Sequence, residues 1–350
     1  MRYLVLHIML FAGCCKLCAQ VDDSWRGING LRFMFYNVEN LFDPFNDTLK
    51  RDDDFTPDGD KRWTWRRMQE KCGGIARVMI AAGGWEALEM VGLCEVENPL
   101  VIRQLVQHPL LQPYGFRYVV TRSPDRRGIN LAFLYRPEKV TLLYHRDIPV
   151  TDPDRPGWVT RDIMYVKLLT LLNDTLHLYL NHWPSRWGGK EQSAPRRALA
   201  ASALRAHVDS LMALPFPVYI LISGDFNDEP SDSSVRYILG AVPPDSPCGS
   251  DLVNLTWPQY QAGEGTHAHR HATGILYSLI DQVIVSRAMT SPHAPISAGQ
   301  TAIPRFPFLL HETASGVEVP YRTYVGPRYQ GGVSDHLPVI LDISLHQNAP

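Results

Sequence analysis

Short apolar runs recur along the chain, and nearly all of them meet a polar side chain at one end. Continuous apolar runs, without the alternation of a half-buried strand, are typical of strands covered on both faces. We therefore predict buried strands over residues 31–36, 90–94, 131–135, 176–180, 218–223, 279–285 and 338–343.

Between these runs, apolar residues recur at helical spacing. Residues 64–82 have this spacing and are followed by two glycines, which favour a helix C-terminus. Residues 196–214 are rich in Ala and Leu, and we predict a helix that opens at Pro195. A third helix is predicted over residues 99–106. Strands dominate, which indicates an α/β fold of two packed sheets flanked by helices.

Each predicted strand carries a polar or charged side chain close to the point where its apolar run stops. Strand ends that share one edge of a layered sheet converge on a single cleft, so we expect these side chains to meet. They are Asn37, Glu95, Arg127, His182, Asp225, Asp281 and His336.

Composition and charge limit the class of protein. A chain of 350 residues, 45% of them hydrophobic, can bury a substantial core. No linker, charge run or internal repeat marks a boundary, and we predict one domain over residues 20–350. Residues 1–19 hold two of the 34 Lys+Arg, which leaves 32 against 36 Asp+Glu, a net charge of −4. A broad positive face for nucleic acid is therefore not expected, although a local basic cleft stays possible.

Residues 1–19 have the pattern of a secretory signal peptide. A short basic start, Met1-Arg2, precedes an apolar stretch that is too short to span a membrane. We predict cleavage after Ala19 and export to the periplasm or the extracellular space, with no transmembrane segment. A lipoprotein attached through Cys14 is the alternative, but Phe11 stands where a leucine is expected.

The mature chain would keep three cysteines, Cys72, Cys94 and Cys248. Their wide spacing contains no CxxC pair, so neither a zinc knuckle nor a disulfide framework is supported. Cys94 lies in an apolar run and is expected to be a small buried side chain. A single Cys72–Cys248 bridge is left open by the sequence.

The sharpest local signal follows the run 218–223. After Gly224, Asp225 and Asn227 occupy alternate positions and point the same way. A carboxylate and an amide side by side can hold a hard cation together with a phosphate or an attacking water. The alternative is an Asx-rich turn, because Gly-Asp and Asn-Asp pairs are common in turns.

Asp335 and His336 form a second signal, on a turn that enters the run 338–343. The carboxylate suits a metal, and the imidazole suits a developing negative charge. A further carboxylate bonded to His336 would raise its pKa and fix its orientation. An exposed turn is the alternative.

His182 leaves the run 176–180 and could donate a hydrogen bond to a phosphate oxygen, while Arg186 could clamp the same group. A lone histidine is more often a core or surface group. Glu95 is the expected metal anchor, with Asn37 beside it. For Glu97, a surface charge or helix-terminal acid is the favoured interpretation.

Six motifs occur in an order that resembles the endonuclease/exonuclease/phosphatase superfamily, the fold of deoxyribonuclease-I-like and exonuclease-III-like enzymes. The resemblance covers residues 31–343, nearly the whole mature chain. Its motifs are residues 35–42 (FYNVENLF), 93–98 (LCEVEN), 181–186 (NHWPSR), 224–228 (GDFND), 280–286 (IDQVIVS) and 334–338 (SDHLP).

The resemblance implies a four-layer α/β sandwich with two central mixed β-sheets flanked by helices. It also implies a role for each matching position. Glu95 and Asn37 bind Mg²⁺, and Asp335 is a metal or metal-water ligand. The other roles are Asp225 orienting or deprotonating the attacking water, Asn227 holding water or phosphate, His182 contacting phosphate or leaving group, and Asp281 pairing with His336.

An oxygen-rich ligand set fits Mg²⁺, with Mn²⁺ or Ca²⁺ also possible, better than structural Zn²⁺. Water would attack phosphorus in line, with the metal and His336 offsetting the growing charge. Arg127 resembles a substrate-side basic group. His269 and His271 could be interpreted as a further metal site, but no carboxylate completes the set.

Three functions stay open. A secreted nuclease or phosphodiesterase is favoured, with a phosphate groove and stacking tryptophans. A phosphomonoesterase acting on inositol phosphates or phospholipid head groups would use the same residues. A non-catalytic module would lack catalytic groups, whereas each matched position is competent. We expect a monomer without a stable protein partner. The groove and stacking candidates are Arg66, Arg67, Lys71, Arg126, Arg127, Lys190, Arg196, Arg197, Trp63, Trp65, Trp183 and Trp187.

Overall fold

The computed structural model of the chain describes residues 30–247, 249–272 and 274–347. The predicted export segment, residues 1–19, and Cys248 lie outside the described residues. Within these ranges, every helix is too short or too polar to cross a lipid bilayer.

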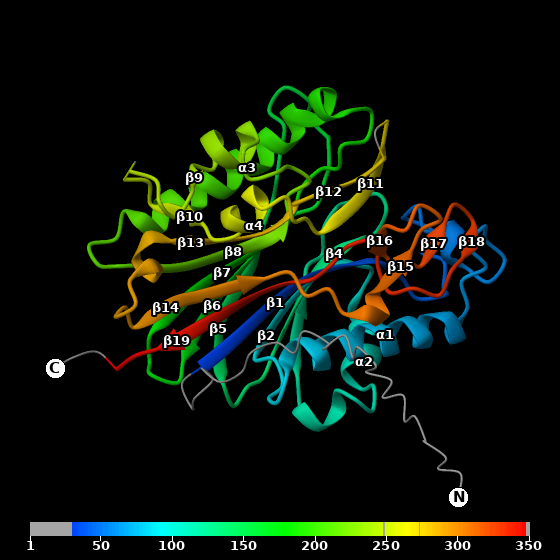
Figure 1. The fold of residues 1–350 in the computed structure, drawn as a ribbon, viewed down its shortest axis with the longest axis horizontal. Helices are drawn as coiled ribbons and strands as arrows, with labels where there is room; N and C mark the ends of the chain where they lie inside the picture. Colours follow the sequence, from blue (N-terminus) through cyan, green and yellow to red (C-terminus); the bar gives the residue numbers. More distant parts are fainter. Residues whose placement is uncertain (1–29, 248, 273, 348–350) are drawn as a thin grey trace, which may run out of the picture.

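Two β-sheets lie face to face at the centre of the molecule (Figure 1). The six-stranded sheet consists, in spatial order, of β14 (Ile296–Ala302), β19 (Val339–Leu345), β1 (Gly30–Leu41), β2 (Met90–Val96), β4 (Asn130–Tyr135) and β3 (Arg117–Val120). The seven-stranded sheet consists of β5 (Val140–Ile148), β6 (Ile163–Thr170), β7 (Thr175–His182), β8 (Tyr219–Asp225), β13 (Asp281–Ser286), β10 (Leu252–Asn254) and β9 (Ala241–Val242).

Both sheets are mixed. The pairs β1–β2, β7–β8 and β9–β10 are parallel, whereas the other neighbours in the two sheets are antiparallel. The first strand, β1, pairs antiparallel with the last, β19, inside the six-stranded sheet. The buried Arg32 side chain on β1 reinforces this pairing, because its Nε donates to Asp342 Oδ1 over 2.6 Å.

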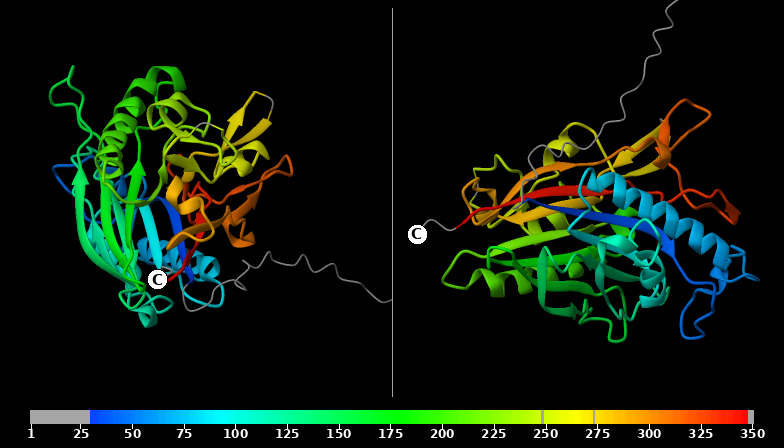
Figure 2. Two further views of the ribbon diagram at one scale, coloured as in Figure 1. Left: turned by 90° about the vertical axis from the view of Figure 1, so that its left-hand side faces the viewer. Right: turned by 90° about the horizontal axis from the view of Figure 1, so that it is seen from below.

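Helices cover the outer faces of the two sheets (Figure 2). They are α1 (Trp65–Gly83) and α2 (Pro99–Val106) on the six-stranded sheet, α3 (Lys190–Met212) on the seven-stranded sheet, and the short α4 (Trp257–Gln261). Single turns are η1 (Asp53–Phe55), η2 (Gln112–Tyr114), η3 (Ser234–Ile238), η4 (Arg287–Thr290) and η5 (Pro307–Leu309). Three small hairpins are β11 (His267–His271) with β12 (Gly274–Ser278), β15 (Leu310–Glu312) with β16 (Glu318–Pro320), and β17 (Tyr324–Val325) with β18 (Arg328–Tyr329).

Three apolar cores separate the four layers. The central core lies between the sheets and includes Phe33, Phe133 and Leu221. The core under α1 and α2 includes Ile75, and the core under α3 includes Leu204. The predicted four-layer sandwich with two mixed sheets is therefore confirmed.

Every predicted strand and helix is present. The third helix matches its predicted range, and α1 ends as expected at a glycine, Gly84, whose φ of 72° is in the left-handed region. The start of α3 was predicted wrongly, because the helix begins at Lys190 and Pro195 lies inside it. Arg197 bridges back to Lys190 O and Ser193 Oγ, which supports the turns around the proline.

One edge of the two sheets collects the polar strand ends. The parallel pairs β1–β2 and β7–β8 end at this edge, whereas the antiparallel strands β4, β13 and β19 begin there. This topology brings the polar strand ends together at one edge, as the apolar runs in the sequence predicted.

Candidate active site

Strand register places three of the predicted residues side by side in the seven-stranded sheet. His182 is paired with Asp225 between β7 and β8, and Asp225 is paired with Asp281 between β8 and β13. His182 and Asp225 are the last residues of their strands, and Asp281 is the first of its strand. Since paired residues lie about 4.5–5.5 Å apart, the backbone brings the three polar groups together.

Asn37 and Glu95 come from the six-stranded sheet, where β1 and β2 are both irregular. The register between these strands shifts after Asn37, and the register between β2 and β4 shifts around Glu95. Glu95 has a φ of 61°, in a region that non-glycine residues seldom occupy. Such bulges re-aim side chains next to active sites.

The centre of the site is a compact group of polar side chains. Asn37 Nδ2 donates to Asp225 Oδ2 over 3.0 Å. His182 Nε2 lies 3.6 Å from Asp225 Oδ2 and 3.8 Å from Glu95 Oε1. Asn37, His182 and Asp225 are all nearly inaccessible to solvent.

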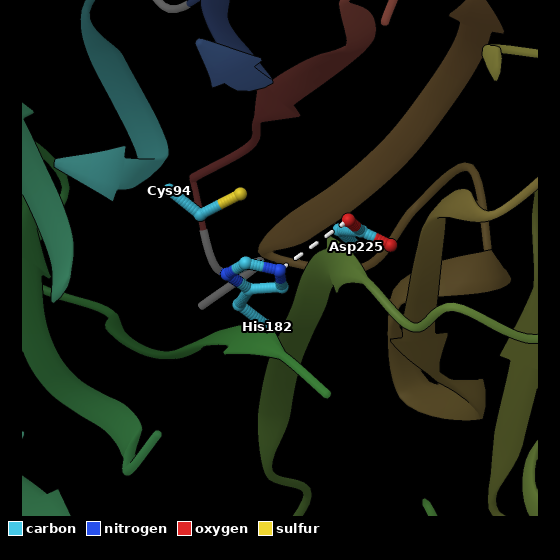
Figure 3. Close-up of side chains that lie close together, drawn as sticks. All are labelled: Cys94, His182 and Asp225. Carbon is cyan, nitrogen blue, oxygen red and sulfur yellow. Dashed lines mark ion pairs between the residues drawn. The ribbon is translucent and has the colours of Figure 1, made fainter. Parts of the chain in front are cut away.

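Cys94 lies close to His182 and Asp225 (Figure 3). One ligand-type atom from each of Cys94, His182 and Asp225 lies within 4.8 Å of the others. Burial raises the pKa of the Cys94 thiol well above its usual range, so the sulfur stays protonated. The prediction of a small buried side chain is confirmed.

His336 reaches the same group from the turn before β19. Its Nδ1 lies 2.7 Å from Asp281 Oδ2, the carboxylate partner that the sequence predicted. Thr266 Oγ1 donates to the same Asp281 oxygen over 2.5 Å. Ser334 accepts from the His336 backbone N–H and donates to Asn37 O, which ties the turn to β1.

The buried charges shift each other's protonation. Burial lowers the pKa of His336, but the attraction of Asp281 and its hydrogen bond outweigh burial and raise the pKa well above the usual range. Burial and the nearby Asp281 raise the pKa of Asp225 to about 7. Burial, with Arg161 and Arg127 nearby, holds the pKa of His182 well below its usual range. His336 is therefore a cation, and His182 is neutral.

Arg127 and Asp335 lie at the rim. Arg127 Nη2 donates to Asn40 Oδ1 over 2.6 Å and lies 3.6 Å from Glu95 Oε2. Asp335 Oδ2 accepts from Arg322 over 2.7 Å, and its other oxygen lies 4.0 Å from His336 Nε2.

Asn227 and Arg186 lie in the loop beyond β8. The Asn227 backbone N–H donates to Asp225 Oδ1 over 2.9 Å, and its side-chain amide donates to Trp183 O over 3.1 Å. Arg186 Nε donates to Asn227 O over 2.6 Å, and Arg186 Nη2 lies 3.4 Å from Asp232. Both residues brace the loop, and their contact with phosphate stays a prediction.

The donor set fits a hard divalent cation. Carboxylates of Glu95 and Asp225 face one small space together with the Asn37 amide, and Asp281 keeps one buried oxygen without a hydrogen-bond partner among the described residues. Burial, with the negative charge of Asp281 nearby, raises the pKa of Asp225, and a bound cation would offset both effects.

Several residues around the site were not predicted. Thr266 and Arg322 carry contacts to Asp281 and Asp335, and Arg161 donates to His182 O over 3.2 Å. They lie outside the six motifs, so only spatial contact reveals them. Glu97 is buried and accepts from Asp43 N over 2.6 Å, so its interpretation as a surface charge was wrong.

Some of the side chains predicted to form a phosphate groove are buried and cannot line one. Lys71 is buried and donates to Val333 O over 2.8 Å, and the buried Arg197 pairs with Asp228 over 2.7 Å. Trp63 and Trp183 belong to apolar cores and cannot stack on a base. Cys72 is free and buried, whereas Cys248, the other half of the bridge that the sequence leaves open, lies outside the described residues.

Comparisons with known proteins agree with this geometry. The sequence profile of the Endonuclease/Exonuclease/phosphatase family matches residues 32–345, and the chain belongs to this family. Members of the family hydrolyse phosphoester bonds, so the protein is an enzyme of that class. No curated protein sequence is similar enough to match the chain.

Solved structures share the fold at low sequence identity. D. rerio TDP2 complexed with single-strand DNA product is 15% identical, covers 90% of this chain and 99% of its own, and has a TM-score of 0.54. The human Nocturnin catalytic domain with bound sulfate is 13% identical, with coverages of 91% and 95% and a TM-score of 0.54. A Bacteroides thetaiotaomicron mannosyl-6-phosphatase is 15% identical, with coverages of 90% and 100% and a TM-score of 0.56.

Proposed function

We propose that the protein is a divalent-metal-dependent hydrolase of compact phosphate esters, in which water attacks phosphorus in line. The observation that supports this most directly is the meeting of two opposite charge environments at one sheet edge. Glu95 and Asp225 supply negative charge, and His336, kept protonated by Asp281, supplies a buried cation close to Asp225.

Glu95, with Asn37 beside it, would hold the cation, for which Mg²⁺ is the expected ion. When bound, such an ion offsets the negative charge that develops on the phosphoryl oxygens. Asp335 would be a more distant ligand that acts through metal-bound water. Its Oδ2 accepts a hydrogen bond from Arg322 over 2.7 Å, which fixes the carboxylate.

Asp225 is the group that orients the attacking water and accepts its proton. Its carboxylate is held from two sides, by Asn37 Nδ2 and by the Asn227 N–H, which leaves little freedom to rotate. Without a bound cation the pKa of Asp225 is about 7, and a cation held by Glu95 would lower it and keep the carboxylate ionised, as a general base requires.

His336 and His182 act on the phosphate. The His336 imidazolium offsets charge on a non-bridging oxygen, and Asp281 keeps it protonated and oriented. The neutral His182 can donate one hydrogen bond to phosphate or leaving group without repelling a metal ion.

The substrate proposed here, a compact phosphate ester, differs from the polynucleotide that the sequence analysis favours. Two of the cations assigned to a phosphate groove are buried in ion pairs or hydrogen bonds, and two of the four tryptophans are in the core. A nuclease is the second candidate, supported by the fold shared with a TDP2 that is complexed with single-strand DNA product.

The test is hydrolysis by purified protein of sugar phosphates, inositol phosphates, phosphodiesters and plasmid DNA, with Mg²⁺ or EDTA. Turnover of small esters that EDTA abolishes is expected, with slow or no cleavage of DNA. Glu95→Gln and His336→Ala should each lower kcat about 100-fold or more, as loss of a key charge-stabilising group does. Full activity in both variants would refute the assignment of the site.

We further propose that the protein is exported, cleaved after Ala19, and active as a monomer. The charge and length pattern of residues 1–19 supports export.

A further inference from the structure

Two hairpins stand beside the site and enclose a cavity. β11–β12 is attached to the active site, because His267 forms an isolated bridge with His336. β15–β16 lies next to it in all three ribbon views (Figures 1 and 2). The cavity has a volume of about 520 Å³ and reaches the site at Asp335.

A second cavity, of about 300 Å³, adjoins the first one. The two share the walls of β11 and the β15–β16 hairpin, including Arg270, Val319 and Pro320. Together they form a trough, with Asp335 in the lining of the first cavity and His311 and Tyr321 in the lining of the second. A volume in the range of small-molecule pockets is more than one phosphate group needs.

The trough is weakly polar along its sides and has two arginines and one carboxylate in its lining. Ala268, Ala314, Val319 and Pro320 provide apolar surface. Arg270 lines both cavities, and Asp335 is the one carboxylate among the described residues that line them.

Arg270 differs from the other arginine of the trough in its partners. Arg322 is neutralised by Asp335 at 2.7 Å and by Glu39 at 3.4 Å. The exposed Arg270 guanidinium forms no ion pair with any carboxylate of the described residues. A cation that lines a cavity without a counter-charge attracts an anionic group of a ligand.

We infer that this trough binds the part of the substrate beyond the reacting phosphate, and that Arg270 receives a second anionic group there. This inference rests on the proposed phosphoester hydrolysis. The substrate is then a compact phosphate ester with a short, weakly polar skeleton that carries another phosphate or a carboxylate at its far end.

Binding can be tested apart from catalysis. Isothermal titration in EDTA would compare alkylene bisphosphonates, phosphonoalkyl carboxylates and alkyl monophosphonates of graded chain length, none of which is hydrolysed. We expect the ligands with two anionic groups to bind the native protein about tenfold more tightly than the alkyl monophosphonates, equivalent to ~1.4 kcal/mol. If the bisphosphonates bind more tightly than the phosphonoalkyl carboxylates, the second anionic group is a phosphate; if the order is reversed, it is a carboxylate.

Arg270→Gln should abolish this difference in affinity, and Ala314→Trp should exclude the longer ligands by filling the trough. Arg103→Gln is the matched control, because Arg103 is an exposed arginine on α2, far from both cavities. It should bind all ligands as the native protein does.

Kinetics then link binding to turnover. For native protein with Mg²⁺, kcat/KM should be about tenfold higher for alkanediol bisphosphates than for alkyl phosphates, ~1.4 kcal/mol, and Arg270→Gln should remove this preference. Equal affinity of native protein for ligands with one and with two anionic groups, or an unchanged preference in Arg270→Gln, would overturn the inference. Tight, Arg270-dependent binding without turnover would support the subsite while refuting the proposed hydrolysis.

Discussion

At the scale of single residues, the site is held by backbone conformations that are unfavourable elsewhere. Glu39, Asn40, Glu95 and Asn227 have positive φ values, and they make up four of the six such non-glycine residues in the described ranges. Such conformations cost about 1–3 kcal/mol each and persist only where the surrounding structure imposes them. Here they occur at the strand ends where Asn37, Glu95 and Asp225 meet.

The charge on His336 should depend on one carboxylate. Asp281→Asn removes the negative charge at 2.7 Å and leaves a group of the same shape, so the pKa of His336 should fall. If the imidazolium is the active form, activity is lost as pH rises through that pKa, and the loss should occur at lower pH in the variant. A pH–rate profile and NMR titration of His336 would measure the shift.

In magnitude, we expect Asp281→Asn to lower kcat about 100-fold or more near neutral pH, because charge stabilisation and imidazole orientation are both lost. Thr266→Val removes one hydrogen bond to the same carboxylate and should have a smaller effect. A native pH profile in Asp281→Asn would show that this pair does not control the reaction.

Residue types could be assigned from sequence wherever a polar group ends an apolar run. Glu95, Asp225 and His336 were found in this way, and the structure brings them together. Thr266 and Arg322 could not be found, because a threonine and an arginine in polar loops have no pattern that distinguishes them. Glu97 was misjudged because burial depends on the loop around Asp43, which is distant in sequence.

At the scale of elements, the spacing of β7 and β8 sets the distance between His182 and Asp225. Gly224 on β8 is paired with Asn181 on β7, and a Cβ there would lie 2.4 Å from Asn181 O. Because the neighbour is backbone, the strands would have to separate to admit a side chain.

Gly224→Ala should therefore lower the free energy of unfolding by about 1–3 kcal/mol, as overpacking does. Activity should fall further than stability explains, since the two catalytic side chains follow directly. Gly249→Ala is the control, because a Cβ at Gly249 meets nothing within 4 Å. Denaturant titration and kcat at saturating substrate measure both effects, and equal values for the two variants would contradict the argument.

His177, on β7, should make the free energy of unfolding depend on pH. Burial, with Lys167 nearby, lowers the pKa of His177 to about 4, and its Nδ1 lies 2.7 Å from Tyr165 OH. The unfolded chain binds this proton near pH 6.5 and the folded chain near pH 4, so stability from this group is lost as pH falls through that window.

His177→Gln should reduce the slope of unfolding free energy against pH between these values. The exposed His293 provides the control, and His293→Gln should leave the slope unchanged. Urea unfolding at several pH values gives both slopes. The same slope in all three proteins would exclude His177 as the titrating group.

Elements with continuous apolar runs were predictable, and those with mixed patterns were not. The edge strand β5 has mostly exposed or half-buried residues, so no apolar run marks it. β6 and β14 were missed for a similar reason, since polar residues interrupt both. The start of α3 was missed because a proline is more usual at the start of a helix. Here hydrogen bonds from the Arg197 side chain support the turns around Pro195, and the sequence does not reveal them.

At the scale of the whole molecule, the export proposal concerns the mature N-terminus. Protein secreted by a bacterial host should begin at Gln20, because Ala19 is the predicted cleavage position. Mass spectrometry of the secreted protein would measure this end directly. A lipid-modified Cys14 would instead establish the lipoprotein alternative, and protein that stays inside the cells with an intact Met1 would refute export.

The pairing of β1 with β19 has a consequence for the timing of folding. Residues 30–35 on the first strand need residues 339–344 on the last, so this contact spans nearly the whole described chain. Until those last residues leave the ribosome, β1 has one unpaired edge and the six-stranded sheet cannot close. Contacts so distant in sequence also form slowly. The nascent polypeptide should therefore lack its complete fold until residues 339–344 are made, and an incompletely folded chain is the form that a secretory translocase threads.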